Sequence, residues 1–375
     1  MNKYLNGYND FISKFEMVGS NVLFLRNDGF LENECSGFSS LEKQELTTNK
    51  SIYRIASISK IIVAIGVLKL YDKKLVDLDE DVSKYLGFIV RNPKYPNDKI
   101  TLRMIMTQTS SIIDDGVCDN GIYKGYDGSN STDDYITLKD LLTPGSNHFY
   151  KGYSDYKPGT NFIYSNLGCG ILACVCEKIT NKYFPEYIKE ELLLPLDIKS
   201  GFRLEDIADP ENLVSHYFYI DEKFKLNRDY DSFKRVQCLK YPLGDNYRGV
   251  AGGLYISAYN LSKIMKMLMN KGIYEGVKIL ESSTVLEMEK VQWEGIPTDP
   301  TYRKKGLQMI ILDQFTEKPL RGHFGNAYGL RSFMLYNENG GLIFLCNGAN
   351  FITDEEHMTV LQEQVIKFLV EKTNI

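Results

Sequence analysis

The sequence lacks an excess of positive charge. Of its 375 residues, 44 are Lys or Arg and 49 are Asp or Glu, which gives a formal net charge of -5 at pH 7. A chain that grips nucleic acid or anionic lipid presents a basic surface, so we expect no nucleic-acid partner. With 43% hydrophobic residues the chain can bury a full core, and its length predicts two packed subdomains.

Long hydrophobic runs are also absent. The most apolar run, residues 61–68, is far shorter than the roughly 20 residues that a membrane-spanning helix requires. The start of the chain carries Asp10 where a secretion signal would have its apolar stretch. We therefore expect a cytoplasmic protein without a membrane partner, and leave export open for a form with residues before Met1.

The cysteines form no disulfide framework. There are seven of them, an odd number scattered along the chain, which is typical of free thiols in a reducing compartment. Cys169, Cys174 and Cys176 lie close together, but a helix would turn Cys174 away from the other two, and no histidine follows at ligand spacing. We predict no metal site and no cofactor.

Turn residues and apolar periodicity predict an α+β fold. Residues 21–25, the turn Asn27-Asp28-Gly29 and the residues from Phe30 onward read as a β-hairpin. Residues 57–72 read as a buried helix, and the later strands at 307–312, 329–336 and 341–347 would rejoin the hairpin. Further helices are predicted at 101–107, 138–142, 165–179, 261–270 and 355–371. We expect a sheet domain from residues 1–75 and 231–375, and an inserted helical domain at 76–230 with a long loop at 112–157.

Three serines precede a lysine by three residues, a spacing that puts hydroxyl and amine on one face of a helix. They are Ser40 with Lys43, Ser57 with Lys60, and Ser154 with Lys157. Only Ser57 opens a buried helix, where a lysine amine can take the serine proton and the positive helix end favours an oxyanion. The alternative is a helix-capping serine beside a solvated lysine.

Ordered motifs extend this pattern. They are Tyr53-Arg54-Ile55-Ala56-Ser57-Ile58-Ser59-Lys60, then Pro158-Gly159-Thr160 and Tyr164-Ser165-Asn166, then Ala251-Gly252-Gly253-Leu254 and His323-Phe324-Gly325. The set resembles the active-site motifs of the serine β-lactamase and DD-peptidase (penicillin-binding protein) superfamily, most closely its class C-like branch. The resemblance covers roughly residues 15 to 370. It implies a β-lactamase/transpeptidase-like fold, with a mostly antiparallel sheet flanked by helices and an inserted all-helical domain.

The resemblance also implies roles for individual residues. Ser57 would be the acylated nucleophile, Lys60 its general base, and Tyr164 the residue that shuttles the proton. Asn166 would orient the substrate amide and the lysine.

His323-Phe324-Gly325 is similar to the strand motif that many members write Lys-Thr-Gly. His323 would offer a weaker, pH-sensitive donor to a substrate carboxylate, which makes efficient β-lactam hydrolysis less expected. Gly325 would keep the strand edge open, and the N–H of Asn326 would join that of Ser57 in an oxyanion hole. No Glu-x-x-Leu-Asn segment is present, so deacylation would use Tyr164 and Lys60.

These features predict a serine hydrolase that cleaves an ester, or an amide or peptide of a small, D-amino-acid-type acyl group. Alternatives are a class C-like β-lactamase and a penicillin-binding or scaffold protein without turnover. The expected partner is a small-molecule or peptide substrate, β-lactams included, and the protein would be a monomer or a homodimer. The loop at 112–157 would form a rim or lid that restricts substrates.

Overall fold

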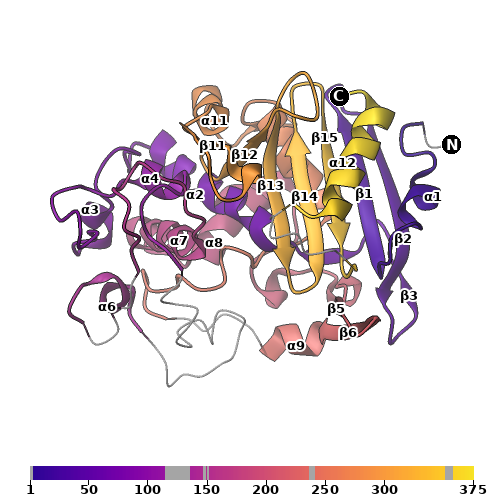
Figure 1. Cartoon of the computed structure of the whole chain (residues 1–375), viewed down its shortest axis with the longest axis horizontal. Helices are drawn as coiled ribbons and strands as arrows, with labels where there is room; N and C mark the ends of the chain where they lie inside the picture. The colour runs from indigo at the N-terminus through magenta and orange to yellow at the C-terminus, as the bar shows by residue number, and fades with distance from the viewer. Residues whose placement is uncertain (1–2, 115–135, 147–148, 150–151, 236–240, 351–357) are drawn as a thin grey trace.

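The computed structural model describes residues 3–114, 136–146, 149, 152–235, 241–350 and 358–375 (Figure 1). Its largest element is a nine-stranded sheet in which every neighbouring pair is antiparallel. In sheet order the strands are β10 (Trp293–Glu294), β11 (Lys304–Gly306), β12 (Met309–Leu312), β13 (Leu320–Ala327), β14 (Leu330–Tyr336), β15 (Gly340–Cys346), β1 (Gly19–Arg26), β2 (Leu31–Ser40) and β3 (Glu45–Leu46).

The predicted N-terminal hairpin is confirmed, and so is its junction with the later strands. β1 and β2 pair from Gly19 opposite Gly37 to Leu25 opposite Leu31. Gly29 closes the turn with a φ of 90°, a conformation that L side chains rarely adopt. On its other side β1 pairs with β15, so the two ends of the chain share one sheet.

The sheet is covered by helices on both faces. Along β1, Leu23 and Leu25 belong to the core that contains α2 (Ser59–Asp72), α7 (Asn166–Thr180) and α10 (Ala258–Met269). The alternate residues Val22 and Phe24 belong to a second core with α1 (Tyr8–Ile12) and α12 (Val360–Thr373). This alternation follows from the two-residue period of a strand. The predicted α+β class is confirmed.

Helix boundaries follow capping residues. Thr101, Thr137, Ser165, Ser257 and Thr359 each accept a backbone N–H at a helix start. They begin α4 (Leu102–Met106), α6 (Leu138–Leu142), α7, α10 and α12 at or within five residues of the predicted positions. The other helices and helical turns of the described residues are η1 (Ala56–Ile58), α3 (Val82–Leu86), α8 (Phe184–Ile188), η4 (Lys189–Leu193), η5 (Leu194–Leu196), η6 (Leu204–Asp206), η7 (Pro210–Asn212), α9 (Tyr230–Arg235), α11 (Ser282–Glu289) and η8 (Pro300–Tyr302).

One hairpin lies within the range predicted to be helical. β5 (His216–Ile220) and β6 (Lys223–Arg228) pair antiparallel. The turn between them consists of Asp221 and Glu222, whose φ angles are 53° and 58°. Aromatic residues of high strand propensity fill β5, so the range 76–230 is not helical throughout. The division into two domains stays an interpretation. Most of the predicted loop at 112–157 lies outside the described residues.

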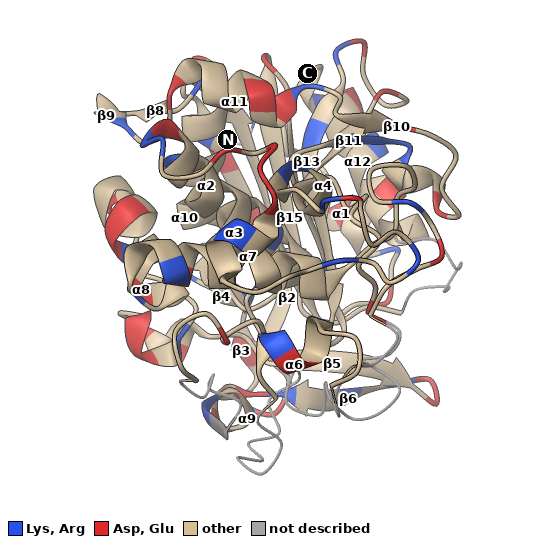
Figure 2. Ribbon diagram, turned by 90° about the vertical axis from the view of Figure 1, so that its left-hand side faces the viewer, with Lys and Arg blue, Asp and Glu red and all other residues tan. Residues whose placement is uncertain are grey.

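Two further two-stranded sheets lie within the described residues. They are β4 (Ile52–Arg54) with β7 (Tyr255–Ser257), and β8 (Ile273–Tyr274) with β9 (Val277–Lys278). Acidic and basic positions are interspersed over the side of the molecule shown in Figure 2. Within the described part of the chain, no helix combines the length and apolar character needed to cross a bilayer.

Candidate active site

Ser57 lies where the chain turns from β4 into the buried helix. It is the central residue of the 3-10 turn η1, which runs directly into α2. The sequence predicts Ser57 in the first turn of the helix, whereas α2 begins two residues later, at Ser59. The preceding residue, Ala56, has a left-handed φ of 48°. Such a conformation is costly for a residue with a side chain and is found where the surrounding structure enforces it. The strain lies immediately beside the candidate nucleophile.

Lys60 reaches back along the helix to Ser57, as their spacing predicted. Its Nζ lies 2.9 Å from Ser57 Oγ, 2.8 Å from Asn166 Oδ1 and 3.1 Å from the Ala251 carbonyl oxygen. These three contacts satisfy an ammonium group, which has three donors. They equally fit a neutral amine that donates to the two fixed acceptors and turns its lone pair to Ser57.

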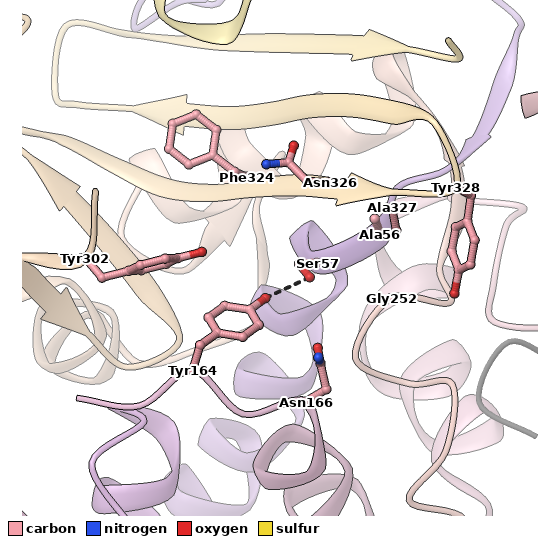
Figure 3. A pocket seen from close by; sticks show the side chains of 10 residues that line it. All are labelled: Ala56, Ser57, Tyr164, Asn166, Gly252, Tyr302, Phe324, Asn326, Ala327 and Tyr328. Carbon is pink, nitrogen blue, oxygen red and sulfur yellow. Dashed lines mark hydrogen bonds between the residues drawn. The ribbon is translucent and has the colours of Figure 1, made fainter. Parts of the chain in front are cut away.

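Tyr164 approaches Ser57 from a different part of the chain, just before α7. Its hydroxyl donates to Ser57 Oγ at 2.8 Å, which Figure 3 shows as a dashed line. Its ring packs at a centroid distance of 5.4 Å from the ring of Tyr302. Ser57 Oγ therefore faces both a phenol and an amine.

Asp114 is a further residue of the site, and sequence reasoning missed it. Its carboxylate accepts from Asn166 N at 2.8 Å, Asn166 Nδ2 at 3.0 Å, Leu167 N at 3.0 Å and Ser165 Oγ at 2.9 Å. Because Nδ2 is bound to Asp114, the Oδ1 atom of Asn166 points to Lys60. The carboxylate also lies at the positive end of α7, where negative charge is stabilised. In the sequence, the only signal for Asp114 is that it is an acidic residue in a polar loop.

The strand β13 borders Ser57 from the other side. Gly325 faces η1 so closely that a Cβ atom there would lie 2.4 Å from the Ile55 carbonyl oxygen. Only glycine lets the strand approach this near. That Gly325 keeps the strand edge open to a substrate stays a prediction. Asn326 borders the cavity, and its side-chain oxygen accepts from Gln362 of α12 at 2.7 Å. Its part in an oxyanion hole stays a prediction.

His323 lies on the face of β13 that carries Gly325, and it is fully buried. Its Nδ1 lies 2.6 Å from the Phe324 carbonyl oxygen, and its ring centroid is 6.3 Å from that of Tyr164. The histidine is not among the described residues that line the cavity, so carboxylate binding by His323 stays a prediction. The Phe324 ring lies on the side of β13 away from Ser57 (Figure 3). Its centroid is 6.2 Å from that of Phe333.

A cavity of about 250 Å³ opens above Ser57 (Figure 3). Tyr164 and Tyr302 border it near one another, and Tyr328 borders it across from them. The described residues that line it carry no charged side chain; they are Ala56, Ser57, Tyr164, Asn166, Gly252, Tyr302, Phe324, Asn326, Ala327 and Tyr328. The structure thus brings Ser57, Lys60, Tyr164 and Asn166 together at one neutral, aromatic cavity.

The antiparallel sheet, the inserted helices and this hydrogen-bonded cluster define a protein of the serine β-lactamase and penicillin-binding protein superfamily. The chain belongs to the Beta-lactamase family, whose family model matches residues 12–366. The resemblance inferred from the ordered motifs is confirmed.

Curated relatives are distant and longer than the matched region. Protein flp from Staphylococcus aureus strain MW2 is 24% identical over 188 residues, which cover 50% of this chain and 35% of flp. Penicillin-binding protein 4* from Bacillus subtilis strain 168 is 25% identical over 219 residues, 58% of this chain and 45% of that protein. The chain therefore spans less than half the length of these relatives.

Solved structures share the fold across most of the chain. D-amino acid amidase from Ochrobactrum anthropi SV3, complexed with D-phenylalanine, has a TM-score of 0.74 at 19% identity and covers 98% of this chain and 96% of its own. D-stereospecific amidohydrolase from Streptomyces sp. has a TM-score of 0.68 at 20% identity, over 97% and 96% of the two chains. An octameric penicillin-binding protein homologue from Pyrococcus abyssi has a TM-score of 0.70 at 23% identity, over 90% of this chain and 71% of that one.

Proposed function

We propose that the protein is a serine hydrolase that forms an acyl-enzyme on Ser57 and cleaves an ester, or an amide or peptide of a small, D-amino-acid-type acyl group. The observation that carries the proposal is the arrangement around Ser57 Oγ, which has Lys60 Nζ at 2.9 Å and the Tyr164 hydroxyl at 2.8 Å. A serine hydroxyl is a weak nucleophile and needs a base within hydrogen-bonding distance.

The contacts support a specific path for the proton. In the neutral form, Lys60 keeps its two donors on Asn166 Oδ1 and Ala251 O, so its lone pair faces the Ser57 proton. As Ser57 Oγ bonds to the acyl carbon, its proton passes to Lys60 and through Tyr164 to the leaving alkoxide or amine. The N–H groups of Ser57 and Asn326 would stabilise the oxyanion.

Deacylation reverses the roles of the same groups. A water molecule gives a proton to Tyr164 or Lys60 and attacks the acyl carbon, Ser57 Oγ regains a proton, and the carboxylic acid leaves. No separate acid is required for this step.

The character of the cavity favours a neutral acyl group. Because the described lining residues have no cationic side chain, the free carboxylate of a β-lactam finds no ion-pair partner among them. The aromatic walls suit an apolar substituent. Structural likeness to D-amino acid amidase and D-stereospecific amidohydrolase supports the D-configured amide as the first substrate class to test.

The experiment that tests the proposal follows intact mass and product release. The protein is mixed with an activated p-nitrophenyl ester, with D- and L-phenylalanine amides, and with a fluorescent penicillin. A transient adduct on Ser57 with release of ester or D-amide product supports the proposal. A persistent penicillin adduct without turnover supports the stalled binder instead, and fast penicillin hydrolysis supports a β-lactamase. No adduct with any probe contradicts an acyl-enzyme.

Tyr164→Phe should slow acylation by the ester about 10²-fold, because the ring and its packing on Tyr302 remain while the proton carrier is lost. Single-turnover kinetics read by intact mass check this. Tyr156→Phe, a change at an exposed tyrosine, is the matched control and should leave the rate unchanged. An unchanged rate in Tyr164→Phe would remove the phenol from the mechanism.

Asp114→Asn should lower kcat/KM about 10- to 100-fold. The amide cannot accept all four hydrogen bonds of the carboxylate, and charge-assisted bonds contribute about 1.5–3 kcal/mol each. Asn166 Oδ1 would then no longer be held toward Lys60. Steady-state ester hydrolysis measures the effect, with Asp155→Asn at an exposed ion pair as control. Equal rates for the two variants would show that Asp114 does not orient Asn166.

A further inference from the structure

A second lysine lies buried beside the site. Lys305 is on β11, where it pairs with Trp293 of β10 and Ile310 of β12, and it is fully buried. Its Nζ lies 5.1 Å from the ring centroid of Tyr302 and 5.5 Å from that of Phe162. No hydrogen-bond partner for this amine is found among the described residues. A buried amine without a partner is costly, and it calls for an explanation.

Within the described part of the chain, the contacts found for this amine are with the faces of two aromatic rings. The faces of aromatic rings attract a cation and offset part of its desolvation. Burial raises the pKa of Tyr302 well above its ordinary value, so that phenol stays neutral and presents its ring rather than a counter-charge. The same ring borders the cavity and packs against Tyr164. Lys305 thus sits directly behind the aromatic wall of the site.

Charged groups on the neighbouring elements are engaged elsewhere. Lys304 is on the other face of β11, with Glu294 at 3.5 Å and Asp313 at 2.8 Å. On α11, Glu287 pairs with Arg103 and Lys290, and Glu289 pairs with Lys271. Asp299 accepts from Thr301 N at the start of η8. Among the described residues, the titratable groups found to act on Lys305 are Tyr302, through its ring face, and Lys60 of α2, through its charge.

Burial lowers the pKa of Lys305 to about 7, and the charge of Lys60 adds to this effect. The amine consequently gains or loses its charge near neutral pH. Below that range it is a cation inside a region of low dielectric, where its field acts strongly on groups nearby.

We propose that Lys305 is a positioning residue that acts on the Ser57 nucleophile from behind Tyr302, whose ring packs against Tyr164, by adding a positive charge next to the site. The proposal rests on the acyl-enzyme function proposed above. The charge of Lys305 stabilises the negative charge that develops on Ser57 Oγ and on the acyl oxygen during acylation.

The test measures the acylation rate against pH for the wild type and Lys305→Met, using a p-nitrophenyl ester and intact mass. Near about pH 6 the variant should be about tenfold slower, whereas near about pH 9, where Lys305 is neutral, the two rates should converge. Lys304→Met, on the same strand but the opposite face, is the matched control and should show no pH-dependent ratio to the wild type.

A ratio that stays constant between these pH values would overturn the proposal, because a purely structural role would not follow the titration of Lys305. Equal rates at every pH would overturn it as well. If wild-type Ser57 forms no adduct, the proposed function itself fails and this inference falls with it. Lys305→Leu provides a second apolar variant, so a folding defect in one of them does not decide the result.

Discussion

Replacing Ser57 with alanine should eliminate the covalent adduct and reduce ester hydrolysis by about 10⁴-fold or more. The expected effect is large because Lys60 and Tyr164 both direct their polar atoms at Ser57 Oγ. When the nucleophile is removed, neither group has a reacting atom on which to act. Groups that work as a unit lose their contributions together rather than one by one.

The sequence provides its own control for this prediction. Ser154 also precedes a lysine by three residues, but its Oγ accepts only from the Tyr156 N–H at 3.3 Å among the hydrogen bonds found for that atom in the described residues. Ser154→Ala should therefore keep both adduct and turnover. Intact mass and initial rates check both variants. Residual hydrolysis near the wild-type rate in Ser57→Ala would place the reaction on another residue.

Replacing Lys305 with methionine should stabilise the folded protein by about 3 kcal/mol or more at pH 6 to 7, even while it slows acylation. Methionine fills the same space without a charge to desolvate. The lysine is fully buried, and its amine has no hydrogen-bond partner within the described ranges. A substitution that raises the free energy of unfolding while it slows the reaction is expected at a functional group that is costly to bury.

The pH dependence of that stabilisation has a definite sign. Burial lowers the pKa of Lys305 from 10.5 to about 7 in the folded protein. Below pH 7 the amine is protonated in both states, and the full penalty for burying its charge is present. Between the two values the unfolded chain binds one more proton than the folded one, so wild-type stability rises by about 1.4 kcal/mol per pH unit from this group.

The advantage of Lys305→Met should therefore shrink as pH rises from about 7 toward about 10. Urea unfolding of both proteins at several pH values gives the difference directly, and comparing the two cancels titrations that they share. An advantage that does not change with pH would mean that the pKa of Lys305 is the same in the folded protein and in the unfolded chain, as expected if water reaches the amine.

The parts of the fold that depend on residues close together in the sequence could be predicted from it. The Asp28-Gly29 turn predicted the first hairpin, and the helices predicted at 138–142 and 165–179 begin within one residue of α6 and α7. Ser57 and Lys60 were predictable because helical geometry alone joins residues three apart. Tyr164 and Asn166 required the ordered motif set, since no local rule brings them to α2.

Two residues of the site carried no local signal. Asp114 follows two isoleucines in a polar loop, and its function depends on the start of α7 being folded next to it. Lys305 follows Lys304, and such a pair is normally solvated. The packing of η8 and the segment around Phe162 over β11 buries one lysine and leaves its neighbour in an ion-pair network. Contacts between distant segments decide both cases.

The joining of β1 to β15 sets an order for assembly during protein synthesis. Residues 19–26 leave the ribosome early, yet their partner strand spans residues 340–346 and emerges late. Helices of the inserted segment can form while translation continues. Until β15 is synthesised, one edge of β1 has no partner strand, and an unpaired edge can pair with other chains and aggregate. β13, which packs against the η1 turn that carries Ser57, also leaves the ribosome late. Ser57 is therefore present in the nascent chain for most of its synthesis before the cavity around it is assembled, and the proposed activity requires the completed sheet.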